Sequence, residues 1–276
     1  MEINYTFHSH TFRCGHAVGD IEDYVSLAIA KGYTMYGVSD HVFLPGIHNP
    51  EIRGDYTLFS DYVSTYQLVK EKYKNDIKMY LGFECEYSEY FLDYYRSLLK
   101  EKGFDYLICG QHCGFDSNAK LYGYFGPDIP LSVAFEKYKK DIAGAMKCGL
   151  FLYIAHPDIY FMDATEVNDE CKKVTKEIID LAIKYDAVLE VNRGGFFRDH
   201  HRDGKIYIDY PAEYFWKEVA KTNIKVVFGG DFHDPKEIVD ERYPKMLDEF
   251  IKNTNIKFSD IKEIYIKYKE KLKTIL

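Results

Sequence analysis

The feature that most constrains this sequence is a His-x-His pair at the end of a short strand-like run near the N-terminus. Residues 3–7 have strand-like alternation, and His8 and His10 follow directly. Side chains alternate between the two faces of a strand, so both imidazoles point the same way and can grip one metal ion. Alone the pattern is weak evidence, because a surface strand also produces it by chance. Whether the pair marks a metal site depends on which residues follow the other predicted strands.

Short apolar runs alternate with longer amphipathic runs along the whole chain. Seven strand-like runs cover residues 3–7, 34–39, 78–83, 106–110, 151–155, 188–191 and 225–229. Helical patterns cover residues 21–29, 58–73, 91–102, 133–146, 169–185, 211–221 and 259–276. Strands that alternate with helices imply parallel strands joined by right-handed crossovers. Seven such units without a linker or repeat favour one closed or nearly closed α/β barrel over residues 1–276.

Composition and charge narrow the function classes. No apolar run is long enough to span a bilayer, and no secretory signal pattern precedes the first strand, so we expect a cytoplasmic protein without a membrane partner. The formal net charge is −8, with Lys and Glu interspersed, which argues against a nucleic-acid partner. A small phosphorylated ligand remains possible if bound cations supply positive charge. Six cysteines without a Cys-x-x-Cys motif are expected to be reduced thiols.

Histidines and carboxylates follow the predicted strands. They are His8, His10, His41, Glu84, His112, His156, Asp231 and His233, with His16 on the first loop. In a (β/α) barrel the C-terminal ends of the strands converge on one rim, where active sites form. Imidazole-rich sites with few carboxylates suit Zn, Mn, Fe or Co. Because these ligands are too many for one ion, the sequence predicts a metal cluster.

These motifs resemble those of the polymerase-and-histidinol-phosphatase (PHP) superfamily. The residues that carry the resemblance are His8-x-His10, His16, Ser39-Asp40-His41, Glu84, His112, His156-Pro157 and Gly230-Asp231-x-His233. The resemblance spans nearly the whole chain and implies a distorted, TIM-like (β/α)7 barrel with the metal site at the C-terminal strand ends.

The same resemblance implies three divalent transition metals, which would be Zn, Mn or Fe. The first would be held by His8, His10, Glu84 and Asp231, the second by a bridging Glu84 with His112 and His156, and the third by His16, His41 and His233. Asp40 would either orient a ligand or cap a loop.

Chain length and the stand-alone barrel resemble the histidinol-phosphate phosphatases within the superfamily. Two stretches, residues 156–160 and Asn192-Arg193, depart from the pattern of many of those enzymes. The departure concerns the substrate, so another small phosphomonoester stays open, as does a nuclease of the superfamily. An amidohydrolase would need a metal-bridging Lys where this chain offers Glu84 or His112. A non-enzymatic metal-binding subunit is the last alternative.

The expected reaction is hydrolysis of a phosphate monoester by a hydroxide that bridges two metals. An acid near the rim, Asp40 or a histidine such as His233, would protonate the leaving oxygen. Arg193 could bind the phosphate through two parallel N–H···O bonds from its guanidinium. Alternatively, it could pair with Glu190 or Asp231 and only shape the site. Further expected phosphate contacts are Arg198, His200 and His201 on the same loop. The oligomeric state is left open.

Overall fold

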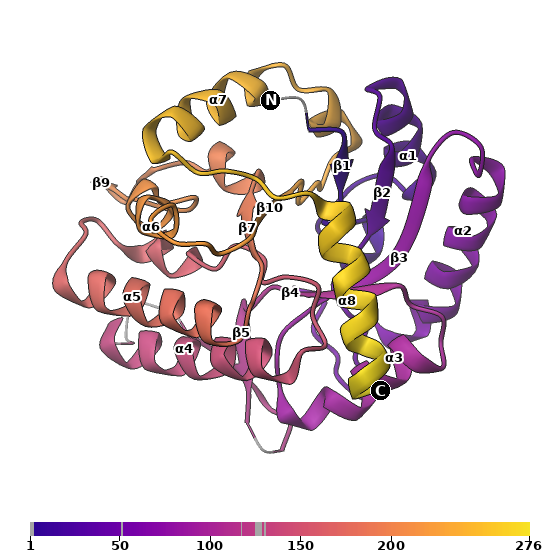
Figure 1. The fold of residues 1–276 in the computed structure, drawn as a ribbon. Coiled ribbons are helices and arrows are strands. Elements are labelled where there is room, and N and C mark those ends of the chain that lie inside the picture. Colours follow the sequence, from indigo (N-terminus) through magenta and orange to yellow (C-terminus); the bar gives the residue numbers. More distant parts are fainter. Residues whose placement is uncertain (1–2, 51, 117, 125–128, 130) are drawn as a thin grey trace.

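A parallel, curled sheet forms the centre of the structure. The computed structural model describes residues 3–50, 52–116, 118–124, 129 and 131–276. In the first sheet, β1 (Tyr5–Thr6), β2 (Met35–Val38), β3 (Lys78–Cys85) and β4 (Tyr106–Cys109) pair in that order, all parallel. A second parallel pair joins β7 (Leu189–Asn192) to β10 (Val226–Gly229). Figure 1 shows the strands inside a surround of helices, so the fold is a mixed α/β fold.

Isolated bridges connect the two sheets. Ile154 bridges both Cys109 and Leu189, and Ser9 bridges Phe232. The predicted strand over residues 151–155 is not a regular strand, because the chain bends at residues 152 and 155 and only Ile154 forms bridges, although its neighbours also exchange backbone hydrogen bonds with β4. Among the described residues, the regular parallel pairings form a curled sheet of four strands and a separate pair of strands. These pairings alone do not close a seven-stranded barrel.

Eight α-helices are present among the described residues, and the sequence predicted seven of them. They are α1 (Ile21–Ala30), α2 (Phe59–Lys72), α3 (Leu92–Lys100), α4 (Leu131–Cys148), α5 (Asp169–Lys184), α6 (Glu213–Val219), α7 (Arg242–Thr254) and α8 (Ile261–Ile275). The start of α1 follows from its cap, since Asp20 and Asp23 exchange side-chain hydrogen bonds with each other's backbone N–H groups. The sequence did not predict α7, whose Tyr243 and Leu247 pack on Phe228 of β10.

Short elements fill several of the connections between the longer strands and helices. Two antiparallel hairpins pair β5 (Cys113–Phe115) with β6 (Leu121–Gly123) and β8 (His201–Arg202) with β9 (Lys205–Ile206). Short 3₁₀ turns cover Phe12–Cys14, Tyr56–Leu58, Glu89–Phe91, Ile159–Asp163, Gly194–Phe197 and Pro235–Val239.

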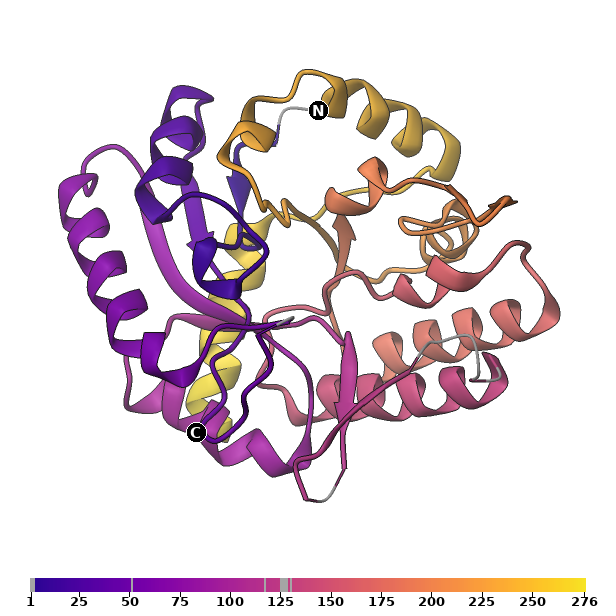
Figure 2. The same ribbon diagram turned by 180° about the vertical axis from the view of Figure 1, so that it is seen from behind.

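The last helix, α8, closes the end of the sheet where the strands begin. Its Tyr268 hydroxyl donates to the Leu150 carbonyl at 2.8 Å and accepts the N–H of Leu107 at 3.3 Å. Figure 2, turned by 180° from Figure 1, shows α8 behind the strands. The loops that leave the C-terminal strand ends therefore lie on the opposite side. Among the described residues, no helix has the length and apolar character needed to cross a membrane.

Candidate metal centre

Glu84 lies at the centre of the predicted cluster. It occupies the C-terminal part of β3 and is 1% exposed. Its Oε1 lies 3.0 Å from Nε2 of His156 and 3.4 Å from Nε2 of His8, and its Oε2 lies 3.1 Å from Nδ1 of His41. Gly110 gives this carboxylate its space, since a Cβ there would lie 1.7 Å from Oε1. The sheet thus places one carboxylate among several imidazoles.

Asp231 is the second carboxylate of the cluster and directly follows Gly230 after β10. Its Oδ1 lies 3.0 Å from Nε2 of His10 and 3.3 Å from Nε2 of His8. Asp231 has a φ of 47° and His156 a φ of 30°, in the left-handed region that non-glycine residues rarely adopt. Such backbone strain persists only where the surroundings enforce it, and it clusters at functional sites.

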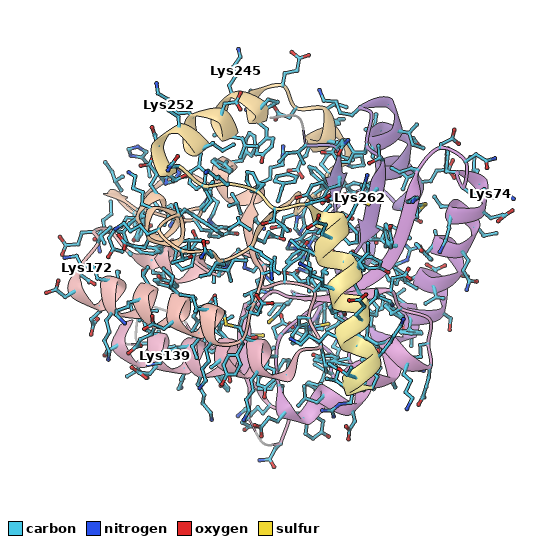
Figure 3. The ribbon with its side chains drawn as sticks, in the orientation of Figure 1. Lys74, Lys139, Lys172, Lys245, Lys252 and Lys262 are labelled. Atoms are coloured by element: carbon cyan, nitrogen blue, oxygen red, sulfur yellow. The ribbon has the colours of Figure 1, made fainter. Side chains whose placement is uncertain are left out.

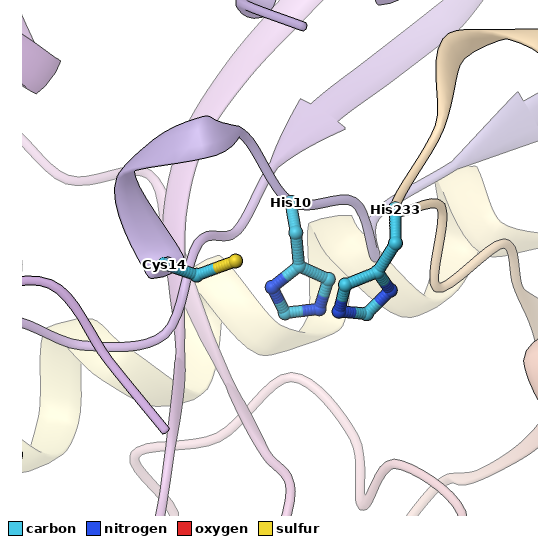
Figure 4. A group of neighbouring side chains, drawn as sticks. All are labelled: His10, Cys14 and His233. Atoms are coloured by element: carbon cyan, nitrogen blue, oxygen red, sulfur yellow. The ribbon is translucent and has the colours of Figure 1, made fainter. Parts of the chain in front are cut away.

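Three further histidines meet beside His10. One ring nitrogen from each of His16, His41 and His233 lies within 4.8 Å of the others. The His10 ring stacks on the His233 ring, with centroids 4.2 Å apart and an interplanar angle of 20°. Figure 4 shows this stack and the Cys14 sulfur, which points toward the His10 ring from the turn at Phe12–Cys14. The three histidines predicted to hold the third ion therefore lie close together, beside His10.

The inner polar atoms of the cluster suit divalent cations. Within the part of the chain that the structure describes, the following buried atoms of the cluster lack a hydrogen-bond partner of good geometry: Nε2 of His8, both ring nitrogens of His10, Nδ1 of His41 and Oε2 of Glu84. A buried polar atom without a partner is costly. Imidazole nitrogens and carboxylate oxygens gathered in this way are the donor set that transition metals prefer.

Glu190 and Asn192 support the cluster from β7. Oε2 of Glu190 lies 2.9 Å from Nδ1 of His8, so the other ring nitrogen faces the two central carboxylates. The Asn192 amide donates to Oε1 of Glu190 at 2.9 Å and to Oδ2 of Asp231 at 3.1 Å. Gly229 leaves room for Glu190, because a Cβ there would lie 2.0 Å from its carboxylate. Such outer hydrogen bonds fix the tautomer and orientation of a ligating histidine.

Asp40 lies behind His10 and not at the open rim. It is fully buried, with Oδ1 3.7 Å from Nδ1 of His10. It also accepts hydrogen bonds from the Thr11 hydroxyl and, at 3.1 Å, from the backbone N–H of His41. These contacts combine the two roles that the sequence left open, since Asp40 both contacts a predicted ligand and holds a loop backbone. They leave it poorly placed to protonate a leaving group.

Burial and charge shift the pKa values of the cluster histidines in opposite directions. Burial opposes protonation of His8 and His10, but neighbouring carboxylates outweigh it, so the pKa of His8 is raised well above its usual value and that of His10 to about 9. Burial dominates at His41, whose pKa is well below its usual value, and at His233, whose pKa falls to about 4. Although burial alone would raise it, the surrounding histidines hold the pKa of Glu84 well below its usual range. Without metal, the cluster therefore mixes charged and neutral imidazoles.

Arg193 does not occupy the position expected of a phosphate clamp. Its side chain is 2% exposed, and its guanidinium lies 3.6 Å from Glu237, 3.9 Å from Asp240 and 4.4 Å from the centre of the Phe197 ring. Among the described residues, neither Glu190 nor Asp231 forms an ion pair with it. The reason is strand alternation: Asn192 points toward the cluster, so the next residue points to the other face.

Tyr210 lies between Arg198 and the edge of the cluster. Its Nε donates to the buried Asp209 at 3.1 Å, and its guanidinium lies 5.4 Å from the Tyr210 ring centre. The Tyr210 ring in turn lies 5.7 Å from the His156 ring. The Arg198 side chain is 34% exposed, and its Nη2 donates to the Met162 sulfur at 3.0 Å. The other two predicted phosphate contacts, His200 and His201, lie at the start of the β8–β9 hairpin. His200 is half-buried, with Nδ1 3.1 Å from the Tyr207 carbonyl, and His201 is exposed.

Sequence reasoning missed three buried groups around the cluster. Glu86 contacts His112, Glu190 contacts His8, and Arg53 pairs with Glu86. Strand alternation could have found the first, because Glu86 follows Glu84 by two positions and so shares its face. No local signal distinguishes Arg53 from any other loop arginine.

The chain is similar to several known proteins. The model of the family described as "PHP domain" matches residues 6–194. A "Probable histidinol-phosphatase" of Deinococcus radiodurans is 24% identical over 235 residues, which cover 84% of this chain and 86% of that protein. A protein of the same description from Schizosaccharomyces pombe is 21% identical over 262 residues, or 86% of this chain and 82% of that protein. A crystal structure of histidinol phosphate phosphatase from Lactococcus lactis with Zn, L-histidinol and phosphate has a TM-score of 0.67 and 16% identity, over 92% of this chain and 95% of that one.

Proposed function

The chain belongs to the PHP domain family, and on that premise we propose that it is a metal-dependent phosphatase that hydrolyses L-histidinol phosphate to L-histidinol and phosphate. The observation that carries the reaction class is the buried Glu84 among imidazoles, of which His8, His10 and His41 have buried ring nitrogens without hydrogen-bond partners. The substrate rests on the two relatives described as histidinol-phosphatases and on the ligands in the similar crystal structure.

We assign the ligands of three divalent ions (Zn, Mn or Fe) to the clustered side chains. His8, His10, Glu84 and Asp231 form the first group, Glu84, His112 and His156 the second, and His16, His41 and His233 the third. In support, Oε1 of Glu84 lies 3.4 Å from Nε2 of His112 and 3.0 Å from Nε2 of His156. When bound, such ions supply an activated water and neutralise phosphoryl charge.

The protein's own residues have separate tasks in this proposal. His233, with a pKa of about 4, is neutral near pH 7, which suits a ligand and does not suit a proton donor. Asp40 orients His10 from behind. Arg198, anchored on Asp209 and stacked near Tyr210, contacts the substrate at the rim. Arg202 strengthens that anchor, since its Nη1 donates to Asp209 at 2.6 Å.

We also propose that the chain is one distorted (β/α)7 barrel. The bridges of Ile154 to β4 and β7, and of Ser9 to the segment after β10, support a ring in the order β1-β2-β3-β4-154-β7-β10. The ring would bring the cluster residues to one rim, where barrel enzymes place their sites.

A nuclease of the same family is the second candidate. The net charge of −8 weighs against it. The lysines labelled in Figure 3 lie around the outside on several helices and project from different sides. Three of them are paired with acidic neighbours, Lys172 with Asp169 at 3.0 Å, Lys139 with Glu177 at 2.8 Å, and Lys74 with Glu71. This arrangement is typical of solvated helix faces.

The test is steady-state phosphate release by protein reconstituted separately with Mn²⁺ and with Zn²⁺. L-Histidinol phosphate, a panel of other phosphomonoesters and a short single-stranded DNA serve as substrates. We expect a kcat/KM for histidinol phosphate on the order of 10⁴ M⁻¹s⁻¹ or more, well above the panel. Glu84→Ala should reduce turnover to background, because it removes the residue shared by two proposed metal groups. Equal turnover of all monoesters would remove the named substrate, and cleavage of DNA alone would favour the nuclease.

A further inference from the structure

We propose that Glu86 and Arg53 are positioning residues for His112. In this proposal the Glu86 carboxylate, held in place by Arg53, fixes the ring orientation and tautomer of His112 so that Nε2 faces Glu84. The inference rests on the proposed function, because it gives a role to the neighbours of a proposed metal ligand.

The geometry forms a continuous buried chain from Arg53 to Glu84. Nη2 of Arg53 donates to Oε2 of Glu86 at 2.7 Å, and the other oxygen, Oε1, lies 3.2 Å from Nδ1 of His112. Nε2 of His112 then lies 3.4 Å from Oε1 of Glu84. Arg53 and Glu86 are 0% and 1% exposed. Each oxygen of Glu86 therefore has a defined partner, and the His112 nitrogen opposite to Glu86 faces the cluster.

His112 needs such a contact more than the other central histidines do. Its side chain is 26% exposed, whereas His8 and His10 are completely enclosed by neighbouring atoms. Rotation about the last side-chain torsion of a histidine is nearly two-fold and exchanges the positions of ring nitrogens and carbons. A half-open ring is not fixed by packing, so a hydrogen bond to Nδ1 has to select the orientation.

Glu86 could alternatively be a metal ligand itself. Donor atoms of His41, Glu86 and His112 lie within 4.8 Å of one another, which leaves room for an ion between them. Arg53 argues against this, because a buried guanidinium at 2.7 Å already neutralises the carboxylate and would repel a cation. The His112 nitrogen nearer to Glu86 is also the one that faces away from Glu84. Orientation is therefore the role that fits both contacts of Glu86.

Arg53 also links the positioning contact to the segment between β2 and α2. Its Nη1 donates to the carbonyl of Val42 at 3.1 Å, and the N–H of Val42 donates to the carbonyl of Glu84 at 2.8 Å. One buried guanidinium thus holds the residue after His41 and the carboxylate behind His112. Its loss would leave Glu86 buried without a counter-charge.

The experiment compares Glu86→Ala and Glu86→Gln with the wild type. Glu89→Gln is the matched control, because Glu89 is exposed on the turn at Glu89–Phe91. Metal-free protein is titrated with Zn²⁺ against a chelator of known affinity, and the ring ¹⁵N shifts of His112 report its tautomer. Phosphatase activity is recorded separately.

We expect Glu86→Ala to weaken the binding of one Zn²⁺ by about 10- to 100-fold and to abolish the single tautomer of His112. Glu86→Gln should recover part of both, because its amide oxygen can still accept from Nδ1. If the alanine variant does not fold, the glutamine variant carries the test through the same two readouts. Glu89→Gln should match the wild type.

Two results would overturn the inference. Unchanged affinity and an unchanged tautomer in the Glu86 variants would make Glu86 a partner of Arg53 only. Complete loss of one Zn²⁺ with the His112 tautomer intact would make it a ligand. A wild type that releases no phosphate would instead defeat the proposed function, and the tautomer of metal-free His112 would still test the inference.

Discussion

The β1–β4 region and the β7–β10 region hold their cluster residues in different ways. From β1 to β4 the strands pair in continuous register, with Glu84 opposite Ile108. In the second region only β7 and β10 pair regularly, and the segment between β4 and β7 contributes isolated bridges at Ile154. Residues 152–155 still exchange backbone hydrogen bonds with β4 and with residues 188 and 190. Just beyond them a buried side chain adds a connection to α6, since Asp158 accepts from the backbone N–H of Ala212 at 2.7 Å and from Nε1 of Trp216 at 2.9 Å.

The difference teaches where each region is vulnerable. A register of backbone hydrogen bonds places side chains whatever their chemistry, so a single lost side-chain hydrogen bond should cost little in the β1–β4 region. Where the regular pairing ends after residue 155, a buried carboxylate joins the chain to α6, so changing its charge should have larger effects. Steric crowding next to a cluster carboxylate should be damaging in both regions.

The largest effect is expected for Gly110→Ala, which crowds Glu84 in the first region. A Cβ at 110 would lie 1.7 Å from Oε1 of Glu84, so the carboxylate must leave its position. We expect phosphate release to fall to background and at least one metal to be lost, as measured by turnover and Zn²⁺ titration. The corresponding change in the second region, Gly229→Ala, displaces Glu190, which supports His8 from outside, and should weaken metal binding only about 10- to 100-fold. Equal effects of the two variants would contradict the assignment of Glu84 to the centre.

A smaller, pH-dependent effect is expected for Asp158→Asn. Burial raises the pKa of Asp158 to about 7, although hydrogen bonds from Ala212 and Trp216 lower it in part. Between about pH 4 and 7 the folded state therefore binds more protons than the unfolded state, and stability falls as the pH rises through this window. Each pKa unit corresponds to about 1.4 kcal/mol, so the wild type should lose a few kcal/mol between pH 5 and 8 relative to the variant. Urea unfolding at both pH values measures this, and parallel pH profiles would refute it.

The smallest effect is expected for Tyr106→Phe in the β1–β4 region. The Tyr106 hydroxyl lies 2.9 Å from the Phe7 carbonyl and 3.0 Å from the Val38 carbonyl, at the end of paired strands. Its removal should lower the free energy of unfolding by about 1 kcal/mol and leave Zn²⁺ affinity unchanged. Denaturant unfolding and metal titration check both. A decrease in the free energy of unfolding larger than the pH-dependent difference between the wild type and Asp158→Asn would reverse the comparison of the two regions.

The sequence predicted the positions of the cluster residues better than their surroundings. His41, Glu84 and His112 each lie at the end of an apolar run, and parallel strands bring such ends together, so a one-dimensional pattern was sufficient. The same alternation rule, applied to β7, would have turned Arg193 away from the cluster and assigned Glu190 to it. The error came from considering residue type before strand face.

Other features could not be predicted because they depend on distant partners. Whether residues 151–155 pair or only bridge depends on the course of the neighbouring strands, which the run itself does not encode. The partnership of Arg53 with Glu86 joins residues that are 33 positions apart in the sequence.

The helix α7, by contrast, could have been predicted from the sequence. Tyr243, Leu247 and Phe250 recur at helical spacing and are all buried.

The contacts between β1 and the end of β10 also determine how the protein can fold. The Thr6 hydroxyl accepts the N–H of Gly230, 224 positions later in the chain, and His8 and Asp231 are joined by a backbone hydrogen bond beside it. Contacts of such sequence separation form late, because the entropy of closing the intervening chain must be overcome first. The β1–β4 region, whose strands are sequential neighbours, can assemble earlier. The complete cluster is therefore a product of the last stage of folding, and an ion that needs both Glu84 and Asp231 can be captured only by a nearly finished protein.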